Sequence, residues 1–372
     1  MSEASGMGAK LLAMIERVRQ APWVVLALLF ASVVGALAQF TGATKSLIDL
    51  VHPSKPDARA ELAKLGIPFT PEAMAKAATD NDVRAVGLLL DAGMAVDAHP
   101  DAGLPPLNIA AQAGNIAVAQ RLIAAGADPA KPSAAGTPIA FAAHYHHPDM
   151  VKLFLASRIP APVVADAFVV AAEVADAASI DLLAPRLDDR RTAATAALHA
   201  RVERTNDAAG DLPALKALLT LKPDLDAVDD HGQTVLHLAI EQDTTATLAA
   251  LLAAGAKPDT PGHCHGLAGE PIVPPLACAA VRGTSEGLAS VRALVAAHAK
   301  VDARTPDGAT PLMLAAGNGD ANIVTALIAA GADVTLRDAK GRTALDYARA
   351  ADFNDPAATR AVLSRALAQH HS

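Results

Sequence analysis

The chain has 372 residues, of which 52 % are hydrophobic and only 3 % aromatic, and its formal net charge is −8. Alanine makes up about a quarter of the chain, and alanine is the best helix former. So few aromatic side chains argue against an aromatic-cored β-sandwich and against modules that stack nucleic-acid bases on aromatic rings. The negative charge gives no bulk attraction to DNA or RNA. We therefore expect an all-α protein that binds no nucleic acid, with the alanine-rich composition typical of a bacterial chain from a GC-rich genome.

The first predicted element is a transmembrane helix over residues 21–40. No charged residue lies between Arg19 and Lys45, and twenty helical residues span about 30 Å, the thickness of the hydrocarbon core. This prediction makes residues 1–20 a cytoplasmic or interfacial segment. It makes residues 41–68 a tether and N-terminal cap for whatever follows.

A cleaved signal peptide is the alternative for this segment, because Ala36-Leu37-Ala38 has the small-residue pattern of a cleavage site. The acidic residues Glu3 and Glu16 in a long leader favour the retained anchor. Arg17 and Arg19 lie close before the span and favour a single-pass orientation with the bulk of the chain on the extracytoplasmic side.

The rest of the chain consists of similar units that recur about every 33 residues. The clearest copy begins Gly308-Ala309-Thr310-Pro311-Leu312 and closes Gly331-Ala332-Asp333. The phrase Gly341-Arg342-Thr343-Ala344-Leu345 begins the next copy. Further copies begin at Gly103, Gly136, Gly232 and Pro274.

Each residue type has a physical reason for its position in the unit. A Thr-Pro pair begins a helix, because the threonine hydroxyl can accept a hydrogen bond at the N-cap and proline fits the first helical position. Glycine ends a helix, because it adopts a positive φ without steric cost. This pattern resembles the ankyrin repeat family, and of its members the membrane-anchored bacterial type. The resemblance implies an all-α solenoid of about nine helix-turn-helix units over residues 69–368, with two degenerate units at residues 163–186 and 191–221.

The resemblance also implies a function: a membrane-tethered scaffold that binds a protein partner through its concave face and hairpin loops. No enzyme motif, cofactor motif or small-molecule substrate site is expected, since the G-x-S-x-G pattern at residues 283–287 falls in a turn between two helices rather than after a strand. In this family the hairpin tips and the ends of the first helices form the binding face. The matching positions here are Asp101, Leu104, Gln112, His144, Tyr145, His231, Gln233, Glu241, Arg282, Asp307, Lys340 and Arg342.

Residues 260–273 are an insertion between two units, and they carry the alternative function of a metal-binding or redox-sensing protein. Imidazole and thiolate are good metal ligands, and His263, Cys264 and His265 are consecutive. Cys278 is the second cysteine of the chain, and the sequence leaves open whether the two cysteines pair.

Other histidines have a structural alternative. The run at residues 144–147 contains three histidines, which either hold a metal or have a structural role, as a surface patch or as caps on helix carbonyls. By its resemblance to the family consensus, His237 is expected to connect neighbouring loops through hydrogen bonds.

Overall fold

The computed structural model describes residues 57–204, 212–267, 269, 271–350 and 356–370. The chain divides into two compact units, residues 1–68 and 69–372. The described part of the first unit contains helix α4 (Ala58–Lys64), which begins where the Asp57 carboxylate accepts a hydrogen bond from the Arg59 amide at 3.2 Å. The predicted membrane segment, residues 21–40, lies outside the described residues. Among the helices that are described, none has the length and apolarity needed to cross a bilayer.

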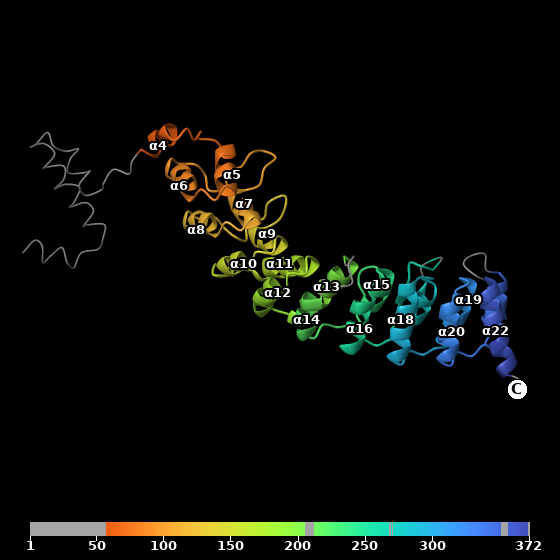
Figure 1. Ribbon diagram of the computed structural model, residues 1–372. Coiled ribbons are helices and arrows are strands. Elements are labelled where there is room, and N and C mark those ends of the chain that lie inside the picture. The colour runs from red at the N-terminus through yellow and green to blue at the C-terminus, as the bar shows by residue number, and fades with distance from the viewer. Residues whose placement is uncertain (1–56, 205–211, 268, 270, 351–355, 371–372) are drawn as a thin grey trace, which may run out of the picture. The chain divides into compact units, whose positions relative to one another are not determined.

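The second unit is built from consecutive pairs of antiparallel helices, which follow one another in chain order (Figure 1). The first helices of the pairs are α5 (Pro71–Thr79), α7 (Pro106–Ala113), α9 (Pro138–His144), α11 (Ala161–Glu173), α13 (Arg190–Glu203), α15 (Val235–Glu241), α17 (Pro275–Ala280), α19 (Pro311–Gly317) and α21 (Ala344–Arg349). The second helices are α6 (Val83–Asp91), α8 (Ile116–Ala124), α10 (Pro148–Leu155), α12 (Ala177–Leu183), α14 (Leu212–Thr220), α16 (Thr245–Ala253), α18 (Ser285–Ala296), α20 (Ala321–Ala329) and α22 (Pro356–His370). A 3-10 turn, η1 (Ala184–Arg186), follows α12. The predicted all-α architecture is confirmed for the described residues.

The helices begin where the sequence predicted. The hydroxyl oxygens of Thr70, Thr137 and Thr310 accept hydrogen bonds from backbone amides three residues later, and a proline follows each threonine. Asp82 and Asp320 cap second helices in the same way. These side chains satisfy backbone amides that have no partner within their own helices.

Packing between pairs holds the unit together. First helices contact the first helices of the neighbouring pairs, as in α5 with α7 and α19 with α21. Most second helices contact their neighbours likewise, as in α6 with α8 and α18 with α20. Alanine and leucine side chains fill these contacts. Ala110, Ala142 and Ala315 on first helices and Leu122 and Leu327 on second helices are fully buried. Because each pair buries its faces only against its neighbours, stability is distributed along the stack.

Side chains also connect neighbouring repeats through backbone groups. The side-chain Nδ2 of Asn115 donates to the carbonyls of Ala78 and Thr79 at the end of the preceding first helix. The side-chain Nδ2 of Asn318 donates to the carbonyl of Val281 in the same way. These bonds satisfy carbonyl groups that have no partner within their own helices.

The degenerate middle of the chain keeps the same architecture. Helix α11 contacts α9 before it and α13 after it, and α13 contacts α15, so the stack continues through residues that lack the Thr-Pro pair. The left-handed turn after the first helix survives as well. Gly114 and Gly319 have φ of 71° and 72° after α7 and α19, and Ala175 has φ of 61° after α11. An L-residue is strained in this conformation, so the middle of the stack carries a local cost that the glycine-containing repeats avoid.

This strain predicts that Ala175→Gly stabilises the protein. Glycine relieves the left-handed strain of the folded state, but it also gives the unfolded chain more conformational entropy to lose on folding. The net gain in the free energy of unfolding is up to about 1 kcal/mol. Urea denaturation followed by circular dichroism measures it. The matched control is Ala196→Gly, at an exposed position inside α13, where the same change should destabilise by about 1 kcal/mol. Destabilisation of similar size at both positions would contradict a left-handed backbone at residue 175.

Candidate functional site

The insertion folds as a short β-hairpin between α16 and α17. Strand β1 (Gly262–His263) pairs antiparallel with β2 (Ile272–Val273), with Gly262 opposite Val273. The His263 amide donates to the carbonyl of Gly232 at 2.9 Å, so the insertion lies beside the tip of the preceding inter-repeat hairpin. The insertion therefore lies next to the hairpin loop of the preceding repeat at this tip.

A disulfide bond connects the insertion to the next repeat. Cys264 follows β1, Cys278 lies in α17, and their sulfur atoms are bonded at 2.04 Å. Both residues are fully buried. The bond fixes one end of the insertion against a core helix. The question that the sequence left open, whether the two cysteines pair, is answered in this structure.

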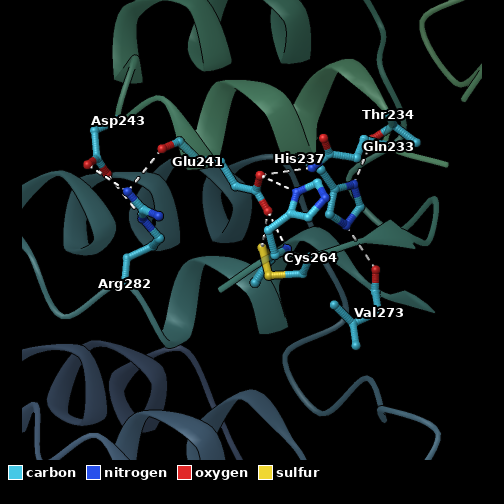
Figure 2. The surroundings of a disulfide bond; sticks show 10 residues. Gln233, Thr234, His237, Glu241, Asp243, Cys264, Val273 and Arg282 are labelled. Carbon is cyan, nitrogen blue, oxygen red and sulfur yellow. Dashed lines mark hydrogen bonds and ion pairs between the residues drawn. A yellow bond between two sulfur atoms is a disulfide. The ribbon is translucent and has the colours of Figure 1, made fainter. Parts of the chain in front are cut away.

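Glu241, the last residue of α15, lies directly beside this disulfide (Figure 2). Its Oε1 accepts a hydrogen bond from the His265 amide at 2.7 Å, and its Oε2 accepts one from Gln233 Nε2 at 2.9 Å. His265 Nδ1 lies 3.0 Å from the same Oε2. The Sγ of Cys278 lies 3.9 Å from Oε1. The side chain of Glu241 is 13 % exposed, so this carboxylate is an internal group that organises the base of the insertion.

His237 lies under the hairpin and connects it to α15. Its Nε2 lies 2.9 Å from the carbonyl of Val273, which can only accept, so Nε2 carries the proton and donates it. Nδ1 then accepts from the Thr234 hydroxyl at 2.8 Å. Burial lowers the pKa of His237 to about 4, despite the carbonyl of Val273 and the nearby charge of Glu241, which both raise it. The imidazole is therefore neutral near pH 7, and the expected role of His237 as a structural connection between loops is confirmed by these contacts.

Arg282, one of the predicted partner-binding residues, makes internal contacts. Its guanidinium donates to the main-chain carbonyl of Glu241 at 3.0 Å and to the Asp243 carboxylate at 2.8 Å (Figure 2). Gln233, another predicted binding residue, is only 3 % exposed, and its amide donates to Glu241. These two side chains differ from the exposed positions that the repeat pattern indicated, because Gln233 bonds the Glu241 carboxylate of its own repeat and Arg282 bonds Glu241 and Asp243 of the preceding repeat.

A second group of predicted residues gathers at the ends of α7 and α9. Tyr145 is 40 % exposed, and its hydroxyl accepts from Gln112 Nε2 at 3.2 Å. The imidazole of His144 contacts the Tyr145 ring edge-on, with ring centroids 4.9 Å apart. His147 Nε2 lies 3.0 Å from the carbonyl of Gln112, so this histidine caps a helix, as one of the two readings of the histidine run predicted. The structure thus brings Gln112, His144 and Tyr145 into one exposed cluster.

Between two successive hairpins, Asp101 and Leu104 line a depression of about 410 Å³. Asp128 and Lys131 of the following hairpin line its other side. His231 is exposed at the hairpin before α15, where its amide donates to Asp229. These three predicted residues remain available at the surface.

The last predicted residues lie on the two C-terminal hairpins. The carbonyl of Asp307 accepts from the Ala339 amide at 3.0 Å, which places these hairpins side by side. Lys340 is exposed. Arg342 donates to the Asp338 carboxylate at 2.8 Å, and its guanidinium lies 4.4 Å from the centre of the Tyr347 ring.

Asp338 is the organising group of this network, and nothing in the sequence pointed to it beyond its place in the turn. Its carboxylate is 1 % exposed, and burial raises its pKa. The Arg342 amide, the Tyr347 hydroxyl and the Arg342 guanidinium outweigh burial and bring the pKa to about 2. Burial and the Asp338 carboxylate raise the pKa of Tyr347 to about 12. This hairpin is therefore held in shape by an ionised carboxylate.

The G-x-S-x-G pattern is part of a helix start. Thr284 caps α18, and its hydroxyl accepts from the Gly287 amide at 2.9 Å. The serine between them, Ser285, is the first residue of that helix and donates to Glu286. The structural reading of this motif is thus confirmed.

A family model described as ankyrin repeats (3 copies) matches residues 74–164 and 276–365. The matched stretches contain the helix pairs with the clearest caps and glycine turns. The chain belongs to the ankyrin repeat family. In this ankyrin repeat protein, the helix pairs between the two matched stretches continue the same stack. The insertion lies just before the second match, and the disulfide connects it to Cys278 within that match.

Proposed function

We propose that the protein is a membrane-tethered scaffold whose repeats, nine by our count of helix pairs, bind a protein partner through the hairpin loops and the ends of the first helices. Ankyrin repeats in general suggest such a role in protein–protein interaction. The observation that carries the proposal is the exposed cluster of Tyr145, His144 and Gln112 at the ends of the first helices α7 and α9. The depression that Asp101 and Leu104 line between two hairpins supports it. Interfaces concentrate their binding energy in a few aromatic and arginine side chains, and an exposed tyrosine held by neighbours is such an anchor.

The structure changes which residues test this proposal. Arg282 and Arg342 hold internal contacts, so substituting them would alter folding as well as binding. Tyr145, His144, Asp101, His231 and Lys340 are exposed, and their loss would leave the buried contacts in place.

We expect Tyr145→Ala to weaken partner capture by about fivefold or more, since loss of an aromatic anchor costs more than about 1 kcal/mol. The measurement is cross-linking in membranes followed by capture of the chain. The amount of one captured partner protein is compared between the variant and the wild-type chain. Tyr145→Phe is the matched control, because it keeps the ring and removes only the hydroxyl that Gln112 contacts. Lys152→Ala, at an exposed position on the second helix α10, controls for the opposite face. Normal capture by Tyr145→Ala together with loss in Lys152→Ala would place the binding face on the second helices.

The tether and the location of the repeats are supported by separate observations. The uncharged segment at residues 21–40 supports the anchor. The Cys264–Cys278 bond supports an extracytoplasmic location, since disulfides persist mainly outside the reducing cytosol. Fractionation of the full chain distinguishes the anchor from a cleaved signal peptide, which would give a soluble product beginning near Gln39.

The alternative function, metal binding or redox sensing, is favoured by one observation, the buried cysteine pair beside Glu241. That site differs from the one the sequence suggested. His263 pairs within the hairpin, whereas Cys264 and His265 of the predicted loop lie with Glu241 of α15 and Cys278 of α17.

A further inference from the structure

The cysteine pair, Glu241 and His265 form a cluster whose chemistry goes beyond partner binding. One ligand atom each from Glu241, Cys264 and Cys278 lies within 4.8 Å of the other two. Two of the three residues are fully buried. His265 adds an imidazole nitrogen 3.0 Å from the carboxylate, on the solvent side, where its side chain is 42 % exposed. Two sulfurs, one imidazole and one carboxylate are a ligand set suited to zinc.

From this geometry we infer that the dithiol state of the protein binds one Zn²⁺ through Cys264, Cys278, Glu241 and His265, and that formation of the disulfide closes the site. The dithiol state is the one that every chain passes through before its disulfide forms. The site is separate from the exposed Tyr145 cluster, so it does not depend on whether that cluster binds a protein.

The distances favour this assignment. In a tetrahedral site with Zn–N and Zn–O bonds of about 2.1 Å and Zn–S bonds of about 2.3 Å, neighbouring ligand atoms lie roughly 3.4 to 3.8 Å apart. Cys278 Sγ is already 3.9 Å from Glu241 Oε1, and His265 Nδ1 is 3.0 Å from Oε2. His265 lies outside the group of ligand atoms that are within 4.8 Å of one another, so its ring has to move toward the sulfurs when zinc binds. The two sulfurs have to separate as well, which reduction of the bond between them allows.

The scaffold around the cluster is built to hold it. Glu241 is oriented by Gln233 Nε2, and its main-chain carbonyl is held by Arg282. Such outer contacts orient metal ligands. Cys278 lies inside α17, and Cys264 adjoins the hairpin that His237 and Gly232 hold in place. The ligands therefore come from two packed helices and a supported hairpin rather than from one mobile loop.

The charge balance explains why oxidation and metal binding exclude each other. A dithiol reductant gives two electrons and two protons to the disulfide, which becomes two thiols while the reductant becomes a disulfide. Binding of Zn²⁺ then releases the two thiol protons, and the metal balances two thiolates and leaves the carboxylate as the one excess negative charge. When the bond forms again from the zinc-bound state, a disulfide oxidant takes two electrons from the two thiolates and two protons from solvent to become a dithiol, and Zn²⁺ is released. Without a metal, two thiolates beside Glu241 would concentrate three negative charges in a buried region. In the oxidised state the sulfurs carry no charge and are poor ligands.

The test uses the full chain with His144→Ala and His146→Ala as a background, so that the exposed histidine run contributes no metal site. After reduction with a phosphine, the protein is expected to bind one Zn²⁺ per chain by equilibrium dialysis. With Co²⁺ as the probe it should show the thiolate-to-cobalt charge-transfer band. The oxidised protein should show neither. Cys264→Ser and Cys278→Ser should each abolish the band, and Glu241→Gln and His265→Ala should each weaken zinc binding about tenfold or more.

Matched controls are Glu286→Gln and His231→Ala, at exposed positions outside the cluster, which should bind zinc as the background protein does. Circular dichroism of each variant shows whether it folds, and Glu241→Gln keeps the size and an acceptor oxygen of the side chain. Zinc binding of equal strength in the oxidised protein would overturn the proposal. So would an unchanged cobalt band in folded Cys264→Ser, or absence of zinc binding in the reduced background protein.

Discussion

Leu312→Ala should lower the free energy of unfolding by about 2–5 kcal/mol, the cost of deleting a fully buried leucine and leaving a cavity. Leu312 is fully buried in α19, which packs between the first helices α17 and α21 of the adjacent repeats. The substitution keeps helix propensity, because alanine is the best helix former, so the loss reports packing between repeats. Urea denaturation gives the change in free energy, and hydrogen exchange of the α19 amides shows whether it is local.

Leu314→Ala is the matched control in the same helix. Leu314 is partly exposed, so the same substitution removes less buried surface and should cost clearly less than at Leu312. Equal costs at the two positions would show that burial between repeats does not decide the stability of this part of the stack. Destabilisation that spreads evenly over every repeat in hydrogen exchange would contradict the nearest-neighbour character expected of a solenoid.

His237 should make the protein less stable as the pH falls from about 6.5 to about 4. Burial lowers its pKa in the folded state from 6.5 to about 4, so between these values the unfolded chain binds a proton that the folded chain does not. The stabilising contribution is therefore fully present above pH 6.5 and is lost as the pH falls to the folded-state value. Its size is about 3 kcal/mol, from roughly 1.4 kcal/mol for each pKa unit.

The measurement is the urea midpoint from pH 7.5 to pH 4.5 for the unchanged chain and for His237→Gln. Glutamine keeps an N–H donor toward the Val273 carbonyl and does not titrate in this range, so the pH dependence of the variant should be flatter by about that amount. The control His231→Gln changes an exposed histidine and should leave the slope unchanged. If His237→Gln kept the full slope, another group would be responsible for it.

The stability of the C-terminal hairpin has a different pH dependence. Asp338 keeps its charge down to about pH 2, because Arg342 and Tyr347 donate to it against the effect of burial. Its contribution is therefore fully present above the ordinary carboxyl pKa of about 3.8 and is lost as the pH falls from about 3.8 to about 2, just below the interval in which His237 acts. The two groups can be separated by titration alone.

Much of the fold could be read from local sequence. Thr70, Thr137 and Thr310 begin helices, and Gly114 and Gly319 end turns, since capping and a positive φ depend on residues within one helical turn. The ends of the helices in the degenerate repeats were harder to predict from sequence, because Ala175 adopts the same left-handed turn without glycine. There, packing against neighbouring repeats overrides a local preference of about 1 kcal/mol.

The sequence by itself determined the helix pairs, their period and the place of the insertion, because these follow from short-range patterns that recur in every copy. Only the tertiary structure decided which side chains face solvent. Gln233 and Arg282 occupy positions of the binding pattern, yet they satisfy a carboxylate and a carbonyl of α15. Only the tertiary structure also brought Glu241 to Cys264 and Cys278, since the hairpin returns the chain to α15 and α17 through contacts that no local preference encodes.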